Sequence, residues 1–373
     1  MRRIVAMADT LSLRALNRAT LARQLLLEPS KLSAPAALER IGGLQAQWPK
    51  PPFVGLWARL ANFKREDLST VLRKRQAVRA TMMRGTIHIT STKDFLATRP
   101  VLQPVLTRGL APIKDRGAGL DLEAVLDAAR EIFKSPRTFE DARDALVAKF
   151  PKANDRALGH IARMMLPLVM VPVDDNSWAY SSVAEFQLAE SWLGKPIATA
   201  TDPSALLLRY FAAFGPASVA DAQSWSGLQS LRAVVDKLRP KLKTFRDERG
   251  RELFDVADAP RPEDDTPAPI RFLQEFDNVL MGYQDRARIL DDAHKPFVLL
   301  PGLRVASTIL IDGRIAAAWK VGRVKKRAVM SIQPFQKMSK QTIAGVTAEG
   351  ERLSQFMEPD AAGHDVSWSP ATR

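Results

Sequence analysis

Residues 42–52 read Gly42-Gly43-Leu44-Gln45-Ala46-Gln47-Trp48-Pro49-Lys50-Pro51-Pro52. Each glycine weakens a helix by roughly 1 kcal/mol relative to alanine, and the prolines that follow exclude a continuous helix. This segment therefore predicts a helix end or an extended turn. Because side chains alternate along extended backbone, Gln45 and Gln47 would project to one side while Ala46 faces the packed interior. Two amides on one side suit joint action on one ligand.

A structural role for the two glutamines is the commoner reason for such residues at this kind of position. Glutamines near a helix end often satisfy free backbone groups or face solvent. The segment alone therefore leaves both interpretations open.

Composition sets the class of protein. The chain has 373 residues, of which 46% are hydrophobic and 26% charged, and this length allows two or three globular domains. No apolar run approaches the roughly 20 residues that span a bilayer, and the apolar run near the N-terminus is too short for a signal peptide. We therefore expect a cytoplasmic protein. The absence of cysteine excludes disulfides, thiolate metal sites and cysteine nucleophiles.

The formal net charge is +14. A surplus of this size favours a polyanionic partner. Nucleic acid fits better than a membrane because the sequence has no basic amphipathic anchor or lipidation signal. Basicity alone is weak evidence, since ordinary basic enzymes share it.

Several short helices followed by a two-stranded hairpin is the order of a winged helix module, and this order occurs three times along the chain. The predicted hairpins pair residues 77–83 with 86–90, 169–173 with 178–180, and 242–245 with 252–256. A linker rich in proline and aspartate spans residues 258–269. The pattern predicts modules at 10–100, 101–200 and 201–258.

Short strands dominate the last hundred residues. Asp312-Gly313 between two apolar runs is a strong hairpin signal. Other strands are predicted near 298–300 and 328–332, with one late helix at 349–356. We therefore predict an α+β chain whose region 270–373 forms a small β-barrel or a curled sheet.

A basic field covers residues 313–348, which contain eight basic residues and no acidic one. These residues are Arg314, Lys320, Arg323, Lys325, Lys326, Arg327, Lys337 and Lys340. Such a field neutralises phosphates and releases counterions without reading the base sequence. A merely solvated turn is the structural alternative.

Arg286 and Arg288 stand two residues apart in a possible hairpin over 277–289. On one face of a hairpin they could enter a nucleic-acid groove or stack on bases. Alternatively, Asp285 neutralises them at a surface turn.

The four histidines lack partners at metal-ligand spacing, so no metal site is expected. The sequence also contains no P-loop, dinucleotide fingerprint or serine elbow. We therefore expect no cofactor, and nucleotide hydrolysis and redox chemistry are excluded on that basis.

Four stretches together resemble one family. They are Leu44-Gln45-Ala46-Gln47 with Pro52, residues 55–59, residues 83–88 and residues 285–288. The chain resembles, over almost its whole length, the AlkZ/YcaQ-type winged helix DNA-binding proteins, bacterial DNA glycosylases that remove bulky alkylpurines and unhook interstrand crosslinks. The resemblance implies three tandem winged helix modules and a C-terminal β-barrel, joined into a C-shape that embraces duplex DNA.

The same resemblance implies roles for individual residues. Gln45 and Gln47 match the family's catalytic Gln-hydrophobic-Gln motif, whose other branch has aspartate in place of the second glutamine. Arg286 and Arg288 match a lesion-probing hairpin, in which Ala287 replaces the usual small polar residue. The further predicted DNA contacts are Arg84, Arg323, Lys325, Lys326 and Arg327.

A purine alkylated at N7 carries positive charge and is already a good leaving group. Two neutral amides could then suffice if their carbonyl oxygens position water and stabilise an oxocarbenium-like sugar. We therefore expect a monofunctional, metal-free and monomeric glycosylase for N7-alkylpurines. The alternatives are a non-catalytic winged helix regulator and an RNA-binding or architectural protein.

Overall fold

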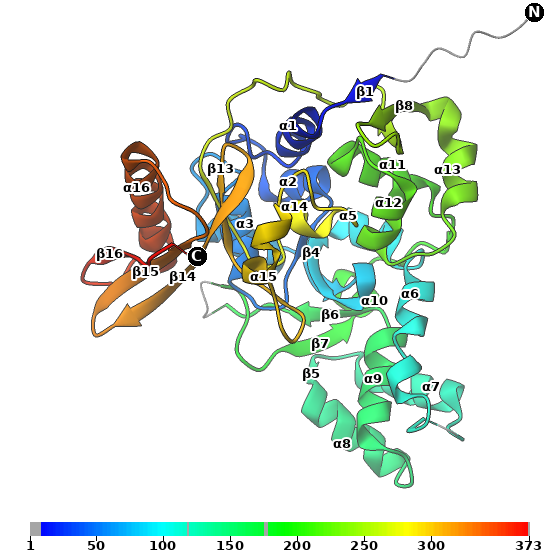
Figure 1. Ribbon diagram of the computed structural model, residues 1–373. Coiled ribbons are helices and arrows are strands. Elements are labelled where there is room, and N and C mark those ends of the chain that lie inside the picture. Colours follow the sequence, from blue (N-terminus) through cyan, green and yellow to red (C-terminus); the bar gives the residue numbers. More distant parts are fainter. Residues whose placement is uncertain (1–8, 118, 175–177, 372–373) are drawn as a thin grey trace, which may run out of the picture.

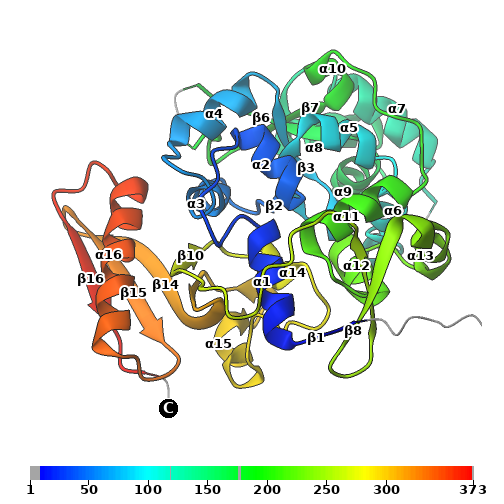
Figure 2. The ribbon, with the colours of Figure 1, turned by 90° about the horizontal axis from the view of Figure 1, so that it is seen from above.

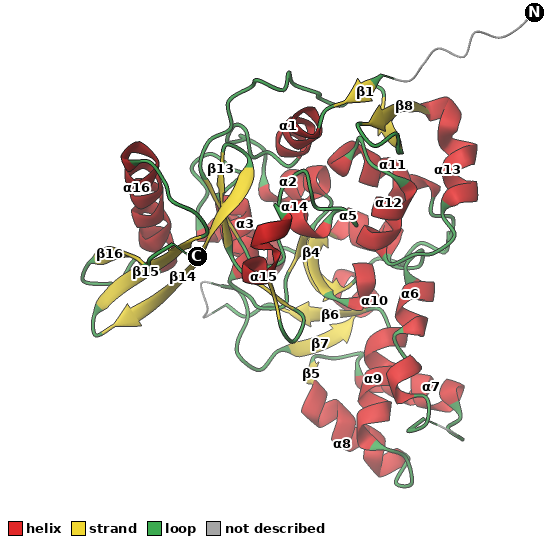
Figure 3. Ribbon diagram, in the orientation of Figure 1, coloured by secondary structure: helices red, strands yellow, loops and turns green. Residues whose placement is uncertain are grey.

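The computed structural model describes residues 9–117, 119–174 and 178–371. These residues form a mixed α+β fold with four sheets (Figure 1). Strands β4, β6 and β7 lie near the centre, with helices on several sides (Figure 3). Within the described ranges, no helix is both long and apolar enough to cross a membrane.

The largest sheet has six strands in the order β2-β4-β3-β6-β7-β5. Its strands are β2 (Leu44–Gln45), β3 (Ala77–Thr81), β4 (Ile87–Ser91), β5 (Arg137–Thr138), β6 (Leu168–Val171) and β7 (Glu185–Leu188). The first predicted hairpin is confirmed as β3 and β4. The second was predicted with the wrong return strand, because β6 pairs with β7 and not with residues 178–180. Ala80 pairs with Val169, so both hairpins belong to one continuous sheet.

Ten α-helices lie between residues 13 and 193 in the described part of the chain, in the same stretch of sequence as this sheet. They are α1 (Leu13–Arg23), α2 (Ala34–Ile41), α3 (Pro51–Trp57), α4 (Arg65–Arg73), α5 (Thr92–Thr98), α6 (Gln103–Arg108), α7 (Leu122–Ile132), α8 (Phe139–Lys149), α9 (Asp155–Met165) and α10 (Ala189–Leu193). One apolar core joins Leu38 of α2 and Phe53 of α3 to Leu158 of α9. The first two predicted modules therefore share both a sheet and a core.

A third group of elements follows in the chain. It contains α11 (Ser204–Phe214), α12 (Val219–Ser226), α13 (Arg232–Leu238), β8 (Leu242–Asp247) and β9 (Glu252–Val256). The predicted third hairpin is confirmed as β8 and β9. The short strand β1 (Thr10–Leu11), from the start of the described chain, adds to β8 in parallel.

The C-terminal region does not form the predicted closed barrel. Its five-stranded sheet has the order β10-β13-β14-β15-β16, and its edge strands β10 and β16 do not pair with each other. The elements are β10 (Arg271–Leu273), α14 (Asn278–Met281), α15 (Lys295–Val298), β11 (Leu299–Leu300), β12 (Arg304–Val305), β13 (Thr308–Ile311), β14 (Arg314–Val324), β15 (Arg327–Pro334), α16 (Lys340–Met357) and β16 (His364–Trp368). Strands β11 and β12 pair as a separate two-stranded sheet.

The long helix α16 explains why this sheet stays open. It carries the chain back so that β16 runs parallel to β15, as a crossover connection requires. Val346 and Leu353 of α16 pack on Phe272, Met330 and Ile332 of the sheet. A helix therefore buries the apolar face that a barrel would bury by closing. Figure 2 shows α16 and β14–β16 together at one end of the molecule.

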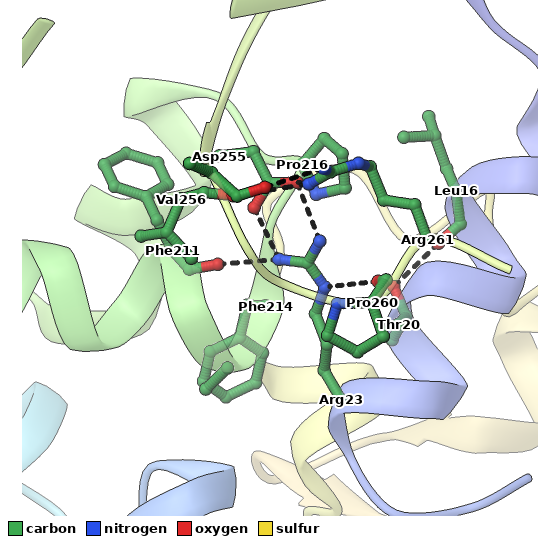
Figure 4. A network of polar contacts seen from close by, with 12 residues as sticks. Leu16, Thr20, Arg23, Phe211, Phe214, Pro216, Asp255, Val256, Pro260 and Arg261 are labelled. Atoms are coloured by element: carbon green, nitrogen blue, oxygen red, sulfur yellow. Dashed lines mark hydrogen bonds and ion pairs between the residues drawn. The ribbon is translucent and has the colours of Figure 1, made fainter. Parts of the chain in front are cut away.

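Buried ion pairs tie distant segments together. Arg23 of α1 is fully buried and makes two hydrogen bonds to Asp255 of β9, at 2.6 and 2.7 Å, while Arg261 also contacts that carboxylate (Figure 4). Arg59, just after α3, pairs in the same bidentate manner with Asp277 at the start of α14, at 3.0 and 2.7 Å. These pairs fix segments that lie more than 200 residues apart in sequence.

Candidate functional site

The glutamine segment begins where α2 ends. Gly42 and Gly43 both have left-handed backbones, with φ of 80° and 78°. A Cβ on Gly43 would lie 2.8 Å from the Thr90 side chain, so only glycine fits at this position. Strand β2 follows, and α3 starts at Pro51. The prediction that this segment interrupts the helix is confirmed.

Gln45 and Gln47 differ in burial but reach toward the same turn. Gln45 is buried, with 4% of its surface exposed, whereas Gln47 is exposed and Ala46 is fully buried. The Gln45 Oε1 accepts a hydrogen bond of 2.8 Å from Arg84, and the Gln47 Oε1 accepts one of 3.0 Å from the backbone N–H of Ile87. Both amides are therefore held where the chain passes from β3 into β4, by Arg84 of the connection and by Ile87 at the start of β4.

These contacts fix which way each amide points. If either amide were flipped, its NH₂ group would face another donor, which is unfavourable. Each carbonyl oxygen therefore faces its protein donor and keeps a second lone pair for another partner. Among the described residues, neither side-chain NH₂ group has a protein acceptor.

Arg84 lies at the centre of this cluster. Its backbone is left-handed, with φ of 58°, inside a 3-10 turn over Met83–Gly85. Besides Gln45, its guanidinium donates to the Trp225 carbonyl at the end of α12, at 2.5 Å. Burial and the nearby Arg286 lower the pKa of Arg84 to about 10, so it remains charged at neutral pH.

His88 of β4 is opposite Gln45 in the sheet. Its Nδ1 lies 3.0 Å from the Thr86 carbonyl and its Nε2 lies 3.3 Å from Arg84 Nη2. Because a carbonyl only accepts, Nδ1 carries the proton and Nε2 accepts from Arg84. Burial and the charge of Arg84 lower the pKa of His88 to about 3. The imidazole is therefore neutral at physiological pH.

The backbone carbonyls of the glutamine segment are also held. Gln274 donates to Gln45 O at 3.0 Å, and Asn278 donates to Gly43 O at 2.7 Å and to Ile41 O at 2.9 Å. Arg79 donates to Ala46 O and Gln47 O, both at 2.9 Å. No local sequence signal indicates these three partners, because they lie 32 to 237 positions from the carbonyls that they hold.

The segment around Arg286 and Arg288 is not the predicted hairpin, since residues 282–290 contain no strand. Half-buried Arg286 donates to Leu280 O at 2.8 Å and lies close enough to Arg84 to lower its pKa. Arg288 is only 5% exposed, donates to Pro216 O at 3.0 Å and covers the Tyr283 ring. The structure therefore brings Arg286, but not Arg288, to the glutamine cluster.

Asp285 does not neutralise these two arginines. Its carboxylate pairs with Arg251 at 2.8 Å and with Arg249 at 3.4 Å, both from the turn between β8 and β9. The alternative prediction, that Asp285 neutralises Arg286 and Arg288 at a surface turn, is therefore wrong.

Arg323, Lys325, Lys326 and Arg327 are exposed around the turn between β14 and β15. Arg327 makes a bidentate pair with Asp365, with both distances 2.6 Å. Lys325 and Lys326 have no ion-pair partner among the described residues. The two lysines therefore present the uncompensated charge of this turn.

One carboxylate connects the basic turn to the glutamine segment. Glu358 accepts from Arg323 Nε at 2.6 Å, and its other oxygen lies 3.6 Å from Lys50 Nζ. Lys50 is only three residues after Gln47. Amide groups held by cationic side chains and linked to a basic turn are features of a protein that acts on nucleic acid.

Comparison with protein families gives the class. Residues 38–356 match the family described as DNA glycosylase AlkZ-like. The chain belongs to this family and is a DNA glycosylase, an enzyme of DNA repair that acts on DNA.

A solved structure agrees with this class at the level of the fold. The fold is similar to that of Streptomyces sahachiroi DNA glycosylase AlkZ, with a TM-score of 0.77 and 20% sequence identity. The match covers 96% of this chain and 100% of that one. A comparison of the sequence with curated proteins gives no match.

Proposed function

We propose that this glycosylase excises N7-alkylated, cationic purines from duplex DNA, and that interstrand crosslinks are further substrates. The observation that carries the proposal is the pair of oriented amides at Gln45 and Gln47. The side chains that support this segment are neutral or cationic. Arg84 donates to the Gln45 amide and contacts His88, while Arg79 and Gln274 donate to backbone carbonyls of Gln47 and Gln45. Such a site supplies no strong base. It therefore suits a substrate whose base is already a good leaving group.

The chemistry follows from that leaving group. When the glycosidic bond breaks, the N7-alkylated base leaves as a neutral molecule and positive charge moves to the sugar. The free lone pairs of the two amide oxygens can accept a hydrogen bond from the attacking water and face the developing charge. The water adds to the anomeric carbon and loses a proton to bulk solvent, which leaves an abasic site. No lysine nucleophile takes part, so the reaction is monofunctional.

Arg84 acts in this proposal through Gln45. Its guanidinium fixes the amide orientation, and neutral His88 holds the guanidinium in turn. Arg288 has a supporting role, because its contacts are inside the protein. The sequence had suggested DNA contacts for both residues.

DNA contacts are assigned to Arg286 at the cluster and to Arg323, Lys325, Lys326 and Arg327 at the basic turn. Guanidinium and ammonium groups bind the phosphates that flank a lesion and release counterions. We further propose three winged helix modules, a cytoplasmic location at the nucleoid, and action as a monomer without a cofactor.

The test is base release from a duplex containing one N7-methylguanine. The wild type should exceed the spontaneous rate, and a second duplex with an N7-linked interstrand crosslink tests unhooking. Replacing both glutamines with alanine should lower the rate at saturating enzyme by roughly 100- to 1000-fold, with DNA affinity unchanged within about twofold. Gln341→Ala, at an exposed glutamine of α16, is the matched control.

Two results would overturn the proposal. Wild-type protein that binds the duplex without releasing base from either substrate would favour a non-catalytic DNA-binding regulator. Equal loss of activity in the Gln341→Ala control would show that the assay does not report on the proposed site.

A further inference from the structure

Trp48 is exposed in an unusual position. It directly follows Gln47, and 65% of its surface is exposed. It is the only aromatic residue among the exposed large hydrophobic residues of the described chain. The others are Leu13, Leu32, Leu122, Val183, Leu303, Val324 and Ile343. The six other tryptophans of the sequence are buried or half-buried.

The indole is presented from a rigid backbone. Gln47 is held on both sides, because Arg79 donates to its carbonyl and its side chain accepts from Ile87. On the other side, Pro49 restricts the conformations open to Trp48. No ring, cation or hydrogen-bond contact to the Trp48 side chain is found among the residues that the structure describes. The exposed ring is therefore neither part of the core nor the tip of an unsupported loop.

Basic residues lie near Trp48 along the chain and are linked to the basic turn. Lys50 lies two residues further along, and Glu358 connects Lys50 to Arg323 of the basic turn. Trp48 directly follows Gln47, so their Cα atoms are about 3.8 Å apart and the exposed indole belongs to the same short segment as the proposed catalytic motif. An aromatic face among basic side chains suits single unstacked bases, because the charges hold the backbone while the ring covers a base.

We infer that Trp48 is the base-stacking residue of this site and packs against a base next to the target nucleotide. The inference rests on the proposed function in taking damaged DNA as the ligand. Disturbing one nucleotide of a duplex exposes the faces of its neighbours, and a flat apolar ring restores the lost contact. Burying the indole there also removes a large apolar surface from water.

The test compares three substitutions at this position. The probe is a labelled duplex with one tetrahydrofuran abasic-site analogue, which cannot be hydrolysed. Trp48→Ala and Trp48→Leu should weaken binding by roughly 5- to 150-fold, whereas Trp48→Phe, which keeps an aromatic face, should stay within about threefold of wild type. The dependence of Kd on salt should be the same for all four proteins, since stacking releases no counterions.

Tryptophan fluorescence gives a second readout that does not depend on activity. The duplex should quench the emission of the wild type more than that of Trp48→Phe. Leu122→Ala, at the start of the distant helix α7 (Figures 1 and 2), is the control for loss of an exposed apolar side chain.

The outcomes separate this inference from the proposed function. Unchanged Kd and equal quenching in the Trp48 variants would overturn the stacking role, whether or not base is released. A wild type that binds and stacks but releases no base would retain the stacking role and overturn only the glycosylase substrate. Failure of the wild type to bind the duplex would overturn both.

Discussion

The glutamine segment and the basic turn are held in opposite ways. From Ile41 to Gln47, backbone carbonyls and side-chain amides accept hydrogen bonds from buried or half-buried groups. At the turn between β14 and β15, Arg323 and Arg327 have ion-pair partners and their side chains stay about half exposed, whereas Lys325 and Lys326 have no such partner in the part of the chain that the structure describes. The difference indicates that one region is built for fixed geometry and the other for charge.

The ion pairs that support the two regions also differ in burial. Arg59 and Asp277 are fully buried, and their pair positions the segment that carries Gln274 and Asn278. The pair of Arg327 with Asp365 is open to water, which screens it. Removing one partner should therefore be costly in the first case and minor in the second.

The largest expected effect is at the buried pair. Asp277→Asn keeps the side-chain oxygen that caps α14 but removes the charge, so Arg59 is left buried without compensation. The free energy of unfolding should fall by about 3–5 kcal/mol in urea denaturation. Asp127→Asn, which breaks an exposed pair on α7, should change it very little. Equal effects of the two substitutions would contradict the comparison.

The second prediction concerns Arg84. Arg84→Met removes the donor that orients Gln45, so base release at saturating enzyme should fall by roughly 10- to 100-fold. Arg84→Lys should recover part of the rate, and Arg84→Met should add little to Gln45→Ala. The salt dependence of DNA binding should stay unchanged. A decrease of about one in that slope would mean instead that Arg84 contacts a phosphate.

The third prediction concerns the basic turn. Replacing Lys325 and Lys326 with glutamine removes two phosphate-binding charges, so the slope of log K against log salt should decrease by about 1.8. Affinity near physiological salt should fall roughly tenfold, while base release at saturating enzyme stays the same. The matched control replaces Lys149 and Lys152, exposed near the end of distant helix α8. An equal loss in this control would indicate general charge attraction and not a defined site.

The smallest effect is the pH dependence of stability from His88. Its pKa in the folded protein, about 3, lies below the unfolded value of about 6.5. Between these values only the unfolded state binds the proton, so acid favours unfolding. Stability should fall between pH 7 and 6 by less than about 1 kcal/mol from this group. His88→Gln, which keeps an acceptor for Arg84, should remove that part of the decrease.

Asp94 changes the pH dependence of stability in the opposite direction. The effect of His88 must therefore be measured as the difference between wild type and His88→Gln. Burial raises the pKa of Asp94 to about 6, so acid favours its folded form. The difference between wild type and His88→Gln cancels this contribution. A steeper loss of stability in His88→Gln than in wild type would contradict the assignment of a neutral histidine.

Local signals predicted many of the elements correctly. The glycine pair and prolines around residues 42–52 predicted the break after α2, and the Asp312-Gly313 turn predicted the β13–β14 hairpin. The predicted return strand at 178–180 and the barrel were wrong. Strand pairing depends on contacts between distant residues, and nothing in the local pattern indicated that α16 would cover the C-terminal sheet.

The sequence by itself determined a basic, cysteine-free α+β chain, the glutamine pair and its likeness to a glycosylase family, because composition and short motifs are local properties. Only the tertiary structure decided that Arg84 faces Gln45, that Arg288 is buried, and that Lys50 meets the basic turn through Glu358. Residue spacing cannot distinguish Arg286 from Arg288. The environment of each side chain is set by elements packed from elsewhere in the chain, which decide burial, hydrogen bonding and charge.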